Sequence, residues 1–349
     1  MQPTLPKRLH VGDTVAVLSI SWGGPAAYPA LFDHGLENIS RYLGLKVVEL
    51  PTARMSNDEL QRHPRLRAED VNAAFRDPEI KAVISSIGGY DSVRILPYID
   101  NRALRENPKI MMGYSDTTTV LSYISLLGGI SLYGPSVMGG LAQLESMPNE
   151  YLEHLRRFLM HGCAGYRYHW YDSWSDGYPD WGSAASAGQV SNRRANAEGW
   201  RWIQGQGGRR EGRLWGGCIE VLEFLKGSDY WPDKSFWNDR VVFFETSEAK
   251  PPVQQIVYML RSYGIQEVFE RSSAILFGRP KAYTDSEKSD LYQALAKVIG
   301  EEFGRPDLPV IANMDFGHTD PKIVLPLGGK VAVDPEEKSV TIVEEFTRD

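Results

Sequence analysis

Short apolar runs alternate with stretches of helical periodicity over roughly the first 150 residues of the chain. The runs at residues 15–20, 46–50, 82–87, 109–112 and 131–135 predict buried strands, and the stretches at residues 32–43, 68–75, 94–99 and 120–124 predict helices. Strands that alternate with helices are typical of βαβ units and a mostly parallel sheet. Ligands of such sheets bind beyond the carboxyl ends of the strands.

The pattern changes after residue 212 and predicts a second domain of mixed α+β structure. Its expected helices lie at residues 217–225, 253–263 and 286–303, and its expected strands at residues 241–244, 274–277 and 309–312. Apolar and polar residues alternate at residues 330–333 and 340–343, which predicts antiparallel hairpins. The predicted fold is therefore α/β, with a Rossmann-like N-terminal domain at residues 1–165 and a C-terminal domain at residues 213–349.

Between these domains, residues 166–212 contain few aliphatic side chains and many Gly, Ser, Asn, Asp, Arg and Trp residues. Long irregular segments are either functional lids or linkers, and disordered linkers are poor in aromatic residues. We therefore expect an ordered lid with flat side chains that face a ligand. The alternative is a surface-packed subdomain in which the Trp rings form a small core.

The clearest chemical signal is a predicted strand that ends on Ser115 and continues as a helix. A turn of this kind projects one hydroxyl at the carboxyl edge of the sheet and leaves backbone N–H groups at the helix start without partners. One bend can thus supply a nucleophile and part of an oxyanion hole. The alternative is that Ser115 is only an N-cap, because Ser before Asp-Thr-Thr caps helices well.

Two further strand ends carry polar residues that could complete such a site. Glu245 follows the predicted strand at residues 241–244, and His318 lies between glycine and threonine in the loop after the strand at residues 309–312. Ser115, Glu245 and His318 would supply a nucleophile, an orienting carboxylate and a general base. Their order along the chain is that of the α/β-hydrolases, although the Gly-x-Ser-x-Gly elbow is missing.

Composition and missing motifs exclude several other classes. The formal net charge of -7 argues against binding a nucleic acid polymer, and no run of 18 or more apolar residues predicts a membrane span. Two cysteines, Cys163 and Cys218, give no disulfide framework or thiolate metal site. The first residues lack the apolar core of a signal peptide. These features together predict a cytoplasmic protein. Glycine-rich phosphate loops and His-Glu-x-x-His are absent, so we expect no metal or cofactor.

Several segments, spread almost from one end of the chain to the other, carry a family resemblance. They are residues 9–17, 67–75, 88–98, 113–116, 133–135, 216–217, 244–245 and 316–319. In these segments the chain resembles the serine LD-carboxypeptidase family, which includes muramoyl-tetrapeptide carboxypeptidases and the microcin C self-immunity proteins. Two positions depart from the family pattern: Ser19-Ile20-Ser21 replaces a more usual Pro-Ser-Ser, and Cys218 stands where many members have Asn.

The resemblance implies a role for each of the candidate residues. Ser115 would be the nucleophile, His318 the general base and Glu245 the orienting carboxylate, with Glu248 as the rival for that last role. The backbone N–H groups of Asp116 and of the Gly88-Gly89 turn would form the oxyanion hole. The active site would lie at the interface of the two domains, and family members are commonly homodimers.

The Trp-rich segment resembles the microcin immunity branch, whose extra loop stacks an aromatic ring on the nucleobase of its substrate. Trp174 and Trp181 are the candidates for this contact, and Tyr90 is a third candidate substrate contact. The resemblance thus implies a serine carboxypeptidase that cleaves a terminal amide of a small peptide or peptidyl-nucleotide. The alternatives are a muramoyl-tetrapeptide carboxypeptidase and, in another class, a non-catalytic protein that binds a small ligand between two α/β domains.

Overall fold

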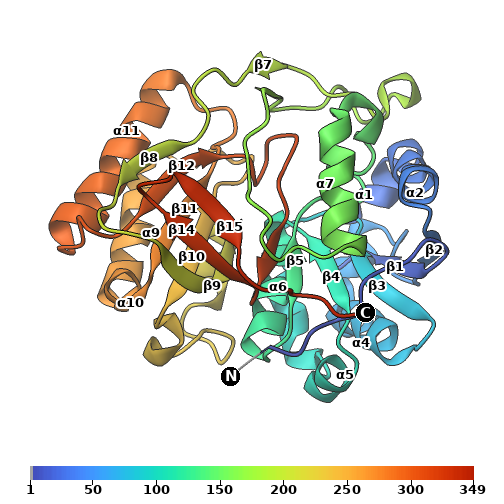
Figure 1. Ribbon diagram of the computed structural model, residues 1–349. Coiled ribbons are helices and arrows are strands. Elements are labelled where there is room, and N and C mark those ends of the chain that lie inside the picture. The colour runs from blue at the N-terminus through green and yellow to red at the C-terminus, as the bar shows by residue number, and fades with distance from the viewer. Residues whose placement is uncertain (1–2) are drawn as a thin grey trace.

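Two β-sheets lie side by side in the computed structural model, which describes residues 3–349 (Figure 1). The first sheet has six strands and the second has seven. Helices cover both sheets, and a long irregular segment runs across one end of the molecule. The α/β class and the two-sheet organisation expected from the sequence are confirmed. No helix among residues 3–349 is both long and apolar enough to cross a membrane.

The first sheet has the strand order β13-β5-β4-β3-β1-β2. Its strands are β1 (Thr14–Leu18), β2 (Lys46–Glu49), β3 (Ile80–Ser85), β4 (Ile110–Gly113), β5 (Ser131–Tyr133) and β13 (Leu325–Leu327). All pairings from β2 to β5 are parallel, and β13 pairs antiparallel with β5. The central strands β3 and β4 are almost wholly buried, as continuous apolar runs in a parallel sheet require.

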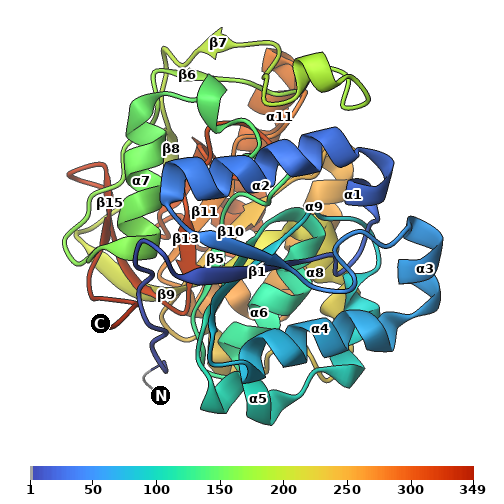
Figure 2. The same ribbon diagram turned by 90° about the vertical axis from the view of Figure 1, so that its right-hand side faces the viewer.

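Helices pack on both faces of this sheet, with α2 on one face and α4 and α5 on the other (Figure 2). The helices of this half are α1 (Gly24–Ala27), α2 (Pro29–Leu43), α3 (Asn57–Arg62), α4 (Pro64–Arg76), α5 (Asn101–Glu106), α6 (Thr118–Leu126) and α7 (Asn149–Met160). The helix α2 ends at Gly44, whose left-handed backbone (φ 67°) is the usual glycine C-cap. The expected helix at residues 94–99 is a 3₁₀ helix at residues 92–98, which contains Pro97.

The second sheet is mixed, with the order β15-β14-β9-β10-β11-β12-β8. Its strands are β8 (Arg201–Gln204), β9 (Arg210–Cys218), β10 (Arg240–Glu245), β11 (Ala274–Gly278), β12 (Val310–Met314), β14 (Lys330–Asp334) and β15 (Ser339–Ile342). The four strands β9 to β12 are parallel, and the outer strands are antiparallel. Its helices are α8 (Ile219–Leu222), α9 (Val253–Ile265), α10 (Val268–Arg271) and α11 (Asp285–Leu295), and α11 continues as a π-helix over Ala296–Glu302.

The strand β9 differs from the sequence-based expectation, which began a helix at residue 217. The strand instead runs through Gly216 and Gly217 to Cys218, and only then does α8 begin. A Cβ on Gly217 would lie 2.4 Å from Cγ2 of Thr118 in α6, and the φ of 153° suits only glycine. Gly217 therefore allows β9 of the second sheet to pack closely on α6 of the first half.

The chain crosses between the sheets a second time near its C-terminus. After β12 of the second sheet, residues 315–324 lead into β13, which joins the edge of the first sheet. The chain then returns to the second sheet as β14 and β15. The two halves are therefore linked by an exchanged strand as well as by side-chain packing.

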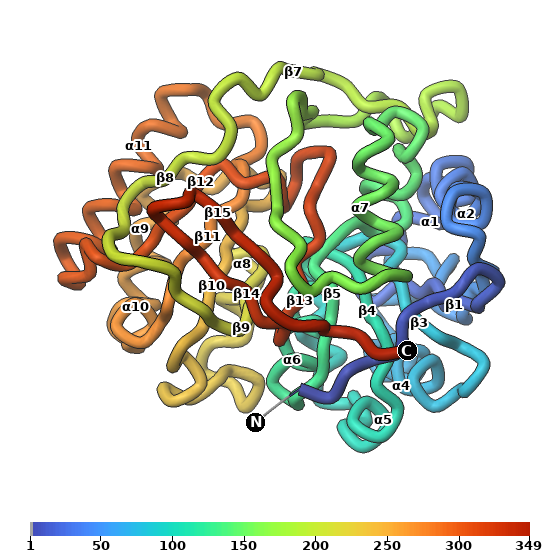
Figure 3. The backbone as a smooth tube through the Cα atoms, in the orientation of Figure 1, coloured from blue at the N-terminus to red at the C-terminus, as the bar shows by residue number. Residues whose placement is uncertain are grey.

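The irregular segment runs from α7 across the top of the molecule to β8, beside α11 (Figure 3). It contains a small two-stranded sheet of β6 (Ser173–Trp174) and β7 (Arg194–Ala195), and β8 pairs with β12. Ser175 N–H donates to the Asp320 carbonyl (2.7 Å), and Asp320 N–H donates to the Ser175 carbonyl (2.9 Å). These bonds attach the segment to the loop that carries His318, so the part of the chain expected to be a lid has ordered contacts.

Candidate active site

Ser115 lies where β4 turns into α6, in a left-handed backbone conformation with φ 58°. A positive φ is uncommon for serine and typical of strained turns that project a nucleophile. The helical turn at residues 115–117 and α6 have Tyr114 and Thr117 as their N-caps, and neither cap uses a side-chain hydrogen bond. Ser115 is therefore not the helix N-cap, which was the alternative reading of the sequence.

His318 and Glu245 meet behind this turn. Glu245 is the last residue of β10 and is 0% exposed, and its Oε2 lies 2.8 Å from Nδ1 of His318. Its Oε1 accepts a hydrogen bond from the hydroxyl of Tyr133, which in turn accepts the N–H of Ser115 at 3.2 Å. Tyr133 at the end of β5 thus connects the backbone of the serine turn to the buried carboxylate.

Glu248 contacts the other nitrogen of the same imidazole. Its Oε2 lies 2.9 Å from Nε2 of His318, and its side chain is 48% exposed. The sequence left Glu245 and Glu248 as rivals for one carboxylate position, and the structure brings both to His318, one on each nitrogen. Glu245 is buried and held by Tyr133, whereas Glu248 is on the solvent side, at the nitrogen that a catalytic base would use.

The two carboxylates control the charge of His318. Burial lowers the pKa of the imidazole, but the nearby charges and hydrogen bonds of Glu245 and Glu248 more than offset this and raise it to about 9. The hydrogen bond from His318 in turn lowers the pKa of Glu248 to about 2. In this arrangement the histidine is an imidazolium at neutral pH.

The Gly88-Gly89 turn lies directly against the serine. A Cβ on Gly88 would be 2.8 Å from Oγ of Ser115 and 3.2 Å from the backbone nitrogen of Asp116, so only glycine fits. The carboxylate of Asp116 accepts the N–H of Ser92 (2.8 Å), and the Ser92 hydroxyl donates to the Asp116 carbonyl (2.6 Å). These bonds fix the start of the helical turn, where Gly88 lies against the Ser115 side chain and Gly89 lines the same cavity.

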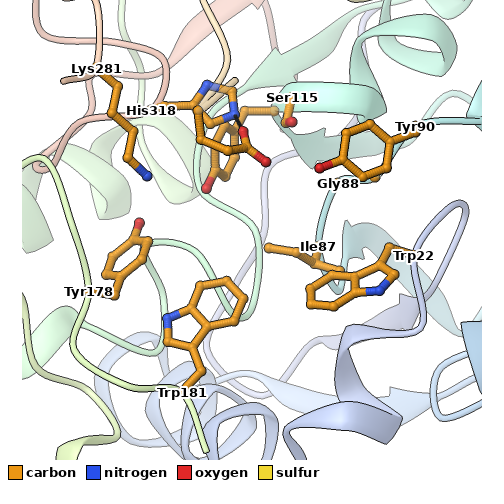
Figure 4. Close-up of a pocket in the computed structure, with 12 residues that line it drawn as sticks. Trp22, Ile87, Gly88, Tyr90, Ser115, Tyr178, Trp181, Lys281 and His318 are labelled. Atoms are coloured by element: carbon orange, nitrogen blue, oxygen red, sulfur yellow. Dashed lines mark ion pairs between the residues drawn. The ribbon is translucent and has the colours of Figure 1, made fainter. Parts of the chain in front are cut away.

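A cavity of about 410 Å³ opens over Ser115 and His318. Its opposite wall is formed by the rings of Trp22 and Trp181, with Tyr178 and Lys281 at one side (Figure 4). The two indoles are stacked with centroids 6.4 Å apart. Trp22 comes from the loop after β1, and Trp181 comes from the irregular segment. The pocket therefore has a wall that contains Ser115 and His318 and an aromatic wall that could hold a flat group.

The three expected substrate contacts have different positions. Trp181 and Tyr90 line this cavity, and Tyr90 is 76% exposed. Trp174 does not: it is buried and lines a separate cavity, where the cationic groups of Arg279 and Lys288 lie over its ring. The ring of Trp174 in β6 lies against Lys288 of α11, so this candidate contact is outside the cavity over Ser115.

Four residues of the site were missed as such by the sequence analysis. They are Trp22, Tyr133, Tyr178 and Lys281. Trp22 and Tyr133 follow or end strands of a parallel sheet, which is a signal that could have suggested them. No signal in the sequence distinguishes Tyr178 and Lys281 from other surface residues.

A second chamber of about 450 Å³ continues from the first on the other side of Ser115. Both share Gly89, Tyr90, Ser115 and Glu248. Further lining residues include Cys218, Glu220, Glu223, Phe224 and Met259. Burial keeps the pKa of the Cys218 thiol well above its usual range, so it is not a second nucleophile. Among residues 3–349 no cluster of three or more His, Cys, Asp or Glu side chains is arranged to hold a metal ion.

Comparison with known proteins assigns both halves of the chain. Residues 15–134 match the LD-carboxypeptidase N-terminal domain, and residues 211–333 match the LD-carboxypeptidase C-terminal domain. The microcin C7 self-immunity protein MccF of Escherichia coli is 29% identical over 99% of this chain and 97% of its own length. The murein tetrapeptide carboxypeptidase of Pseudomonas aeruginosa is 26% identical over 76% of each chain.

Solved structures give the same assignment. MccF in complex with aspartyl sulfamoyl adenosine is 27% identical, covers 99% of this chain and 100% of its own, and has a TM-score of 0.85. An MccF-like protein from Streptococcus pneumoniae in complex with AMP is 27% identical, covers 95% and 98%, and has a TM-score of 0.84. The chain belongs to the LD-carboxypeptidase family and is a serine-type carboxypeptidase.

Proposed function

We propose that this protein hydrolyses the terminal amide of a peptidyl-nucleotide through an acyl-enzyme, with Ser115, His318 and Glu245 as its catalytic triad. The observation that carries this proposal is the buried contact of 2.8 Å between Glu245 and Nδ1 of His318, in the same cavity as a serine with φ 58°. A carboxylate on Nδ1 holds the tautomer whose Nε2 can accept a proton from the nucleophile.

The first half of the reaction forms a bond between Ser115 Oγ and the substrate carbonyl carbon. Nε2 of His318 takes the hydroxyl proton, and the N–H groups of Asp116 and of the Gly88-Gly89 turn stabilise the oxyanion. One missing donor there would cost about 3–4 kcal/mol of barrier. The C–N bond then breaks as His318 returns the proton to the leaving nitrogen. In the second half, His318 takes a proton from water, the water oxygen attacks the acyl carbon, and the proton returns to Ser115 Oγ as the ester bond breaks.

Glu248 must leave Nε2 for this sequence to begin. Its side chain is half exposed and it lies in the part of the cleft that a substrate would enter. A substrate carbonyl near Ser115 would displace the carboxylate and lower the pKa of His318, because one of the two negative charges on the imidazole would move away. Substrate binding would thus convert His318 from an imidazolium to a base.

The aromatic wall supports the nucleotide as leaving group. Trp22 and Trp181 present stacked indoles across the cavity from Ser115, and base–aromatic stacking is worth about 1–3 kcal/mol per base. Lys281 is the one Lys or Arg side chain that lines this cavity among the described residues, and it would face the anionic linker of such a substrate. The MccF complex with aspartyl sulfamoyl adenosine contains a ligand of this chemical kind.

The first test uses the serine. Purified protein is incubated with a fluorophosphonate probe, and separately with an aminoacyl sulfamoyl adenosine and a murein tetrapeptide, with products followed by mass spectrometry. We expect covalent labelling of Ser115 and cleavage of the nucleotide substrate. Cleavage of the tetrapeptide alone would show that the substrate is a muropeptide and not a peptidyl-nucleotide. A wild-type protein that the probe does not label would favour the non-catalytic ligand-binding alternative.

Ser115→Ala is the matched variant. It should lower kcat by at least about 10⁴-fold, because the nucleophile is removed, while leaving the melting temperature nearly unchanged. Circular dichroism and thermal melting of the variant provide the control. Gross unfolding would indicate that Ser115 has a structural role instead.

The resemblance also implies a cytoplasmic homodimer, and light scattering of the purified protein tests the dimer.

A further inference from the structure

The chamber on the far side of Ser115 from the aromatic wall has an unusual charge. Glu220, Glu223 and Glu248 line it, and no Lys or Arg lines it among the described residues. The first cavity shares Glu248 with this chamber but is also lined by Lys281 and His318. Glu220 and Glu223 line only this chamber, and Lys281 lines only the first cavity, so the chamber is the more acidic end of the cleft.

These carboxylates differ in how far they are neutralised. Glu223 is paired with Lys226 at 2.5 Å, and Glu248 is paired with His318. Glu220 has no ion pair with a Lys, Arg or His of residues 3–349. Its Oε1 instead accepts the N–H and the hydroxyl of Ser247 (3.0 and 2.7 Å), and its Oε2 accepts the thiol of Cys218 at 3.4 Å. Glu220 is thus held in a fixed position by neutral donors.

His318 cannot supply the missing positive charge, because the imidazolium faces two carboxylates of its own, Glu245 and Glu248. The groups around the serine end of the chamber therefore carry an excess of negative charge. An acidic acyl group entering this chamber would meet like charge, whereas an ammonium or guanidinium group would find an unpaired carboxylate.

We propose that Glu220 makes this chamber a subsite for an acyl residue with a cationic, amine-bearing side chain. The inference rests on the proposed function in one respect: if the aromatic cavity holds the leaving group, the acyl part of the substrate lies in the acidic chamber. Apolar lining residues, Phe224 and Met259, suit the aliphatic stem of such a side chain, with the charged end at Glu220.

The test measures binding, so that it does not depend on turnover. Lysyl, leucyl and glutamyl sulfamoyl adenosine, and the dipeptides lysyl-, leucyl- and glutamyl-D-alanine, are titrated into the Ser115→Ala protein by calorimetry. In at least one of the two series we expect the lysyl ligand to bind at least about tenfold more tightly than the leucyl ligand, and the glutamyl ligand to bind most weakly. Equal affinities, a preference for glutamyl, or no binding in either series would overturn the proposal.

Two isosteric variants separate specificity from structure. In Ser115→Ala, Glu220→Gln the lysyl preference should fall to within about threefold, because glutamine keeps hydrogen bonding but removes the charge. In Ser115→Ala, Glu223→Gln it should persist, because that carboxylate is already paired with Lys226. A purely structural role of Glu220 would weaken all ligands equally and contradict the proposal. If Ser115 does not react with a fluorophosphonate, the proposed triad is contradicted. The order of ligand affinities is measured independently and still tests the role of Glu220.

Discussion

At the scale of single residues, the contact between Glu248 and Nε2 of His318 predicts the pH dependence of the enzyme. His318 must be neutral to accept a proton, and its pKa is raised to about 9 by Glu245 and Glu248 against the effect of burial. The kcat/KM of the wild type should therefore rise with pH up to about 9, since this parameter reports the groups of the free enzyme.

Glu248→Gln should move that acid limb to lower pH by about one unit or more, because one of the two charges that stabilise the imidazolium is gone. Activity near pH 7 should rise severalfold. The measurement is kcat/KM from about pH 5 to pH 10. Glu223→Gln is the control, since Glu223 is paired with Lys226 and makes no hydrogen bond or ion pair with His318. An unshifted acid limb in Glu248→Gln would show that the carboxylate does not hold the imidazole in solution.

The sequence predicts those residues of the site that lie at or after the ends of predicted strands. Ser115, Glu245 and His318 each follow or end a buried strand; Ser115 and His318 line one cavity, and Glu245 is buried against Nδ1 of His318. Tyr133 also ends a strand, but nothing in the sequence indicates that its hydroxyl joins the serine turn to Glu245. Pairing of side chains across two sheets depends on packing that periodicity does not encode.

At the scale of elements, β9 depends on a glycine where it packs against α6. Gly217→Ala would place a Cβ 2.4 Å from Cγ2 of Thr118 and force alanine into φ 153°. We expect it to lower the free energy of unfolding by about 2–5 kcal/mol, from overpacking and backbone strain together.

Chemical denaturation of Gly217→Ala and of a matched control measures this effect. Gly208→Ala is the control, because a Cβ there meets no atom within 4 Å, and it should change stability by no more than about 0.5 kcal/mol. Equal stability of the two variants would mean that β9 and α6 can move apart without penalty.

Most elements could be predicted because their apolar pattern is long and regular, as in β1, β3, α2 and α9. The strand β9 was partly mistaken for a helix because its glycines resemble a boundary, although they serve close packing. The crossing strand β13 is only three residues long and contains a proline, so no periodicity marks it. Such short strands are specified by their neighbours and not by their own sequence.

At the scale of the whole molecule, the exchanged strand predicts that the two halves unfold together. The strand β13 belongs to the first sheet although it lies between β12 and β14 of the second. Every tryptophan except Trp22 lies beyond residue 169, so tryptophan fluorescence reports mainly on the second half. Far-UV circular dichroism reports on both halves, and the two unfolding curves in urea should superpose. A fluorescence transition that precedes the other would show that the halves are independent.

Segments near the two ends of the chain are bonded to each other at the edge of the molecule away from the cleft. The N–H of Arg348 donates to the Pro6 carbonyl (2.9 Å), and the N–H of Arg8 donates to the Arg348 carbonyl (2.8 Å). The C-terminus and the first described residues of the chain lie on the side opposite α1, which follows the carboxyl end of β1 (Figure 2). A short peptide could therefore join them in a circular permutant, and an affinity tag or a surface tether attached there would leave the mouth of the catalytic cleft unobstructed.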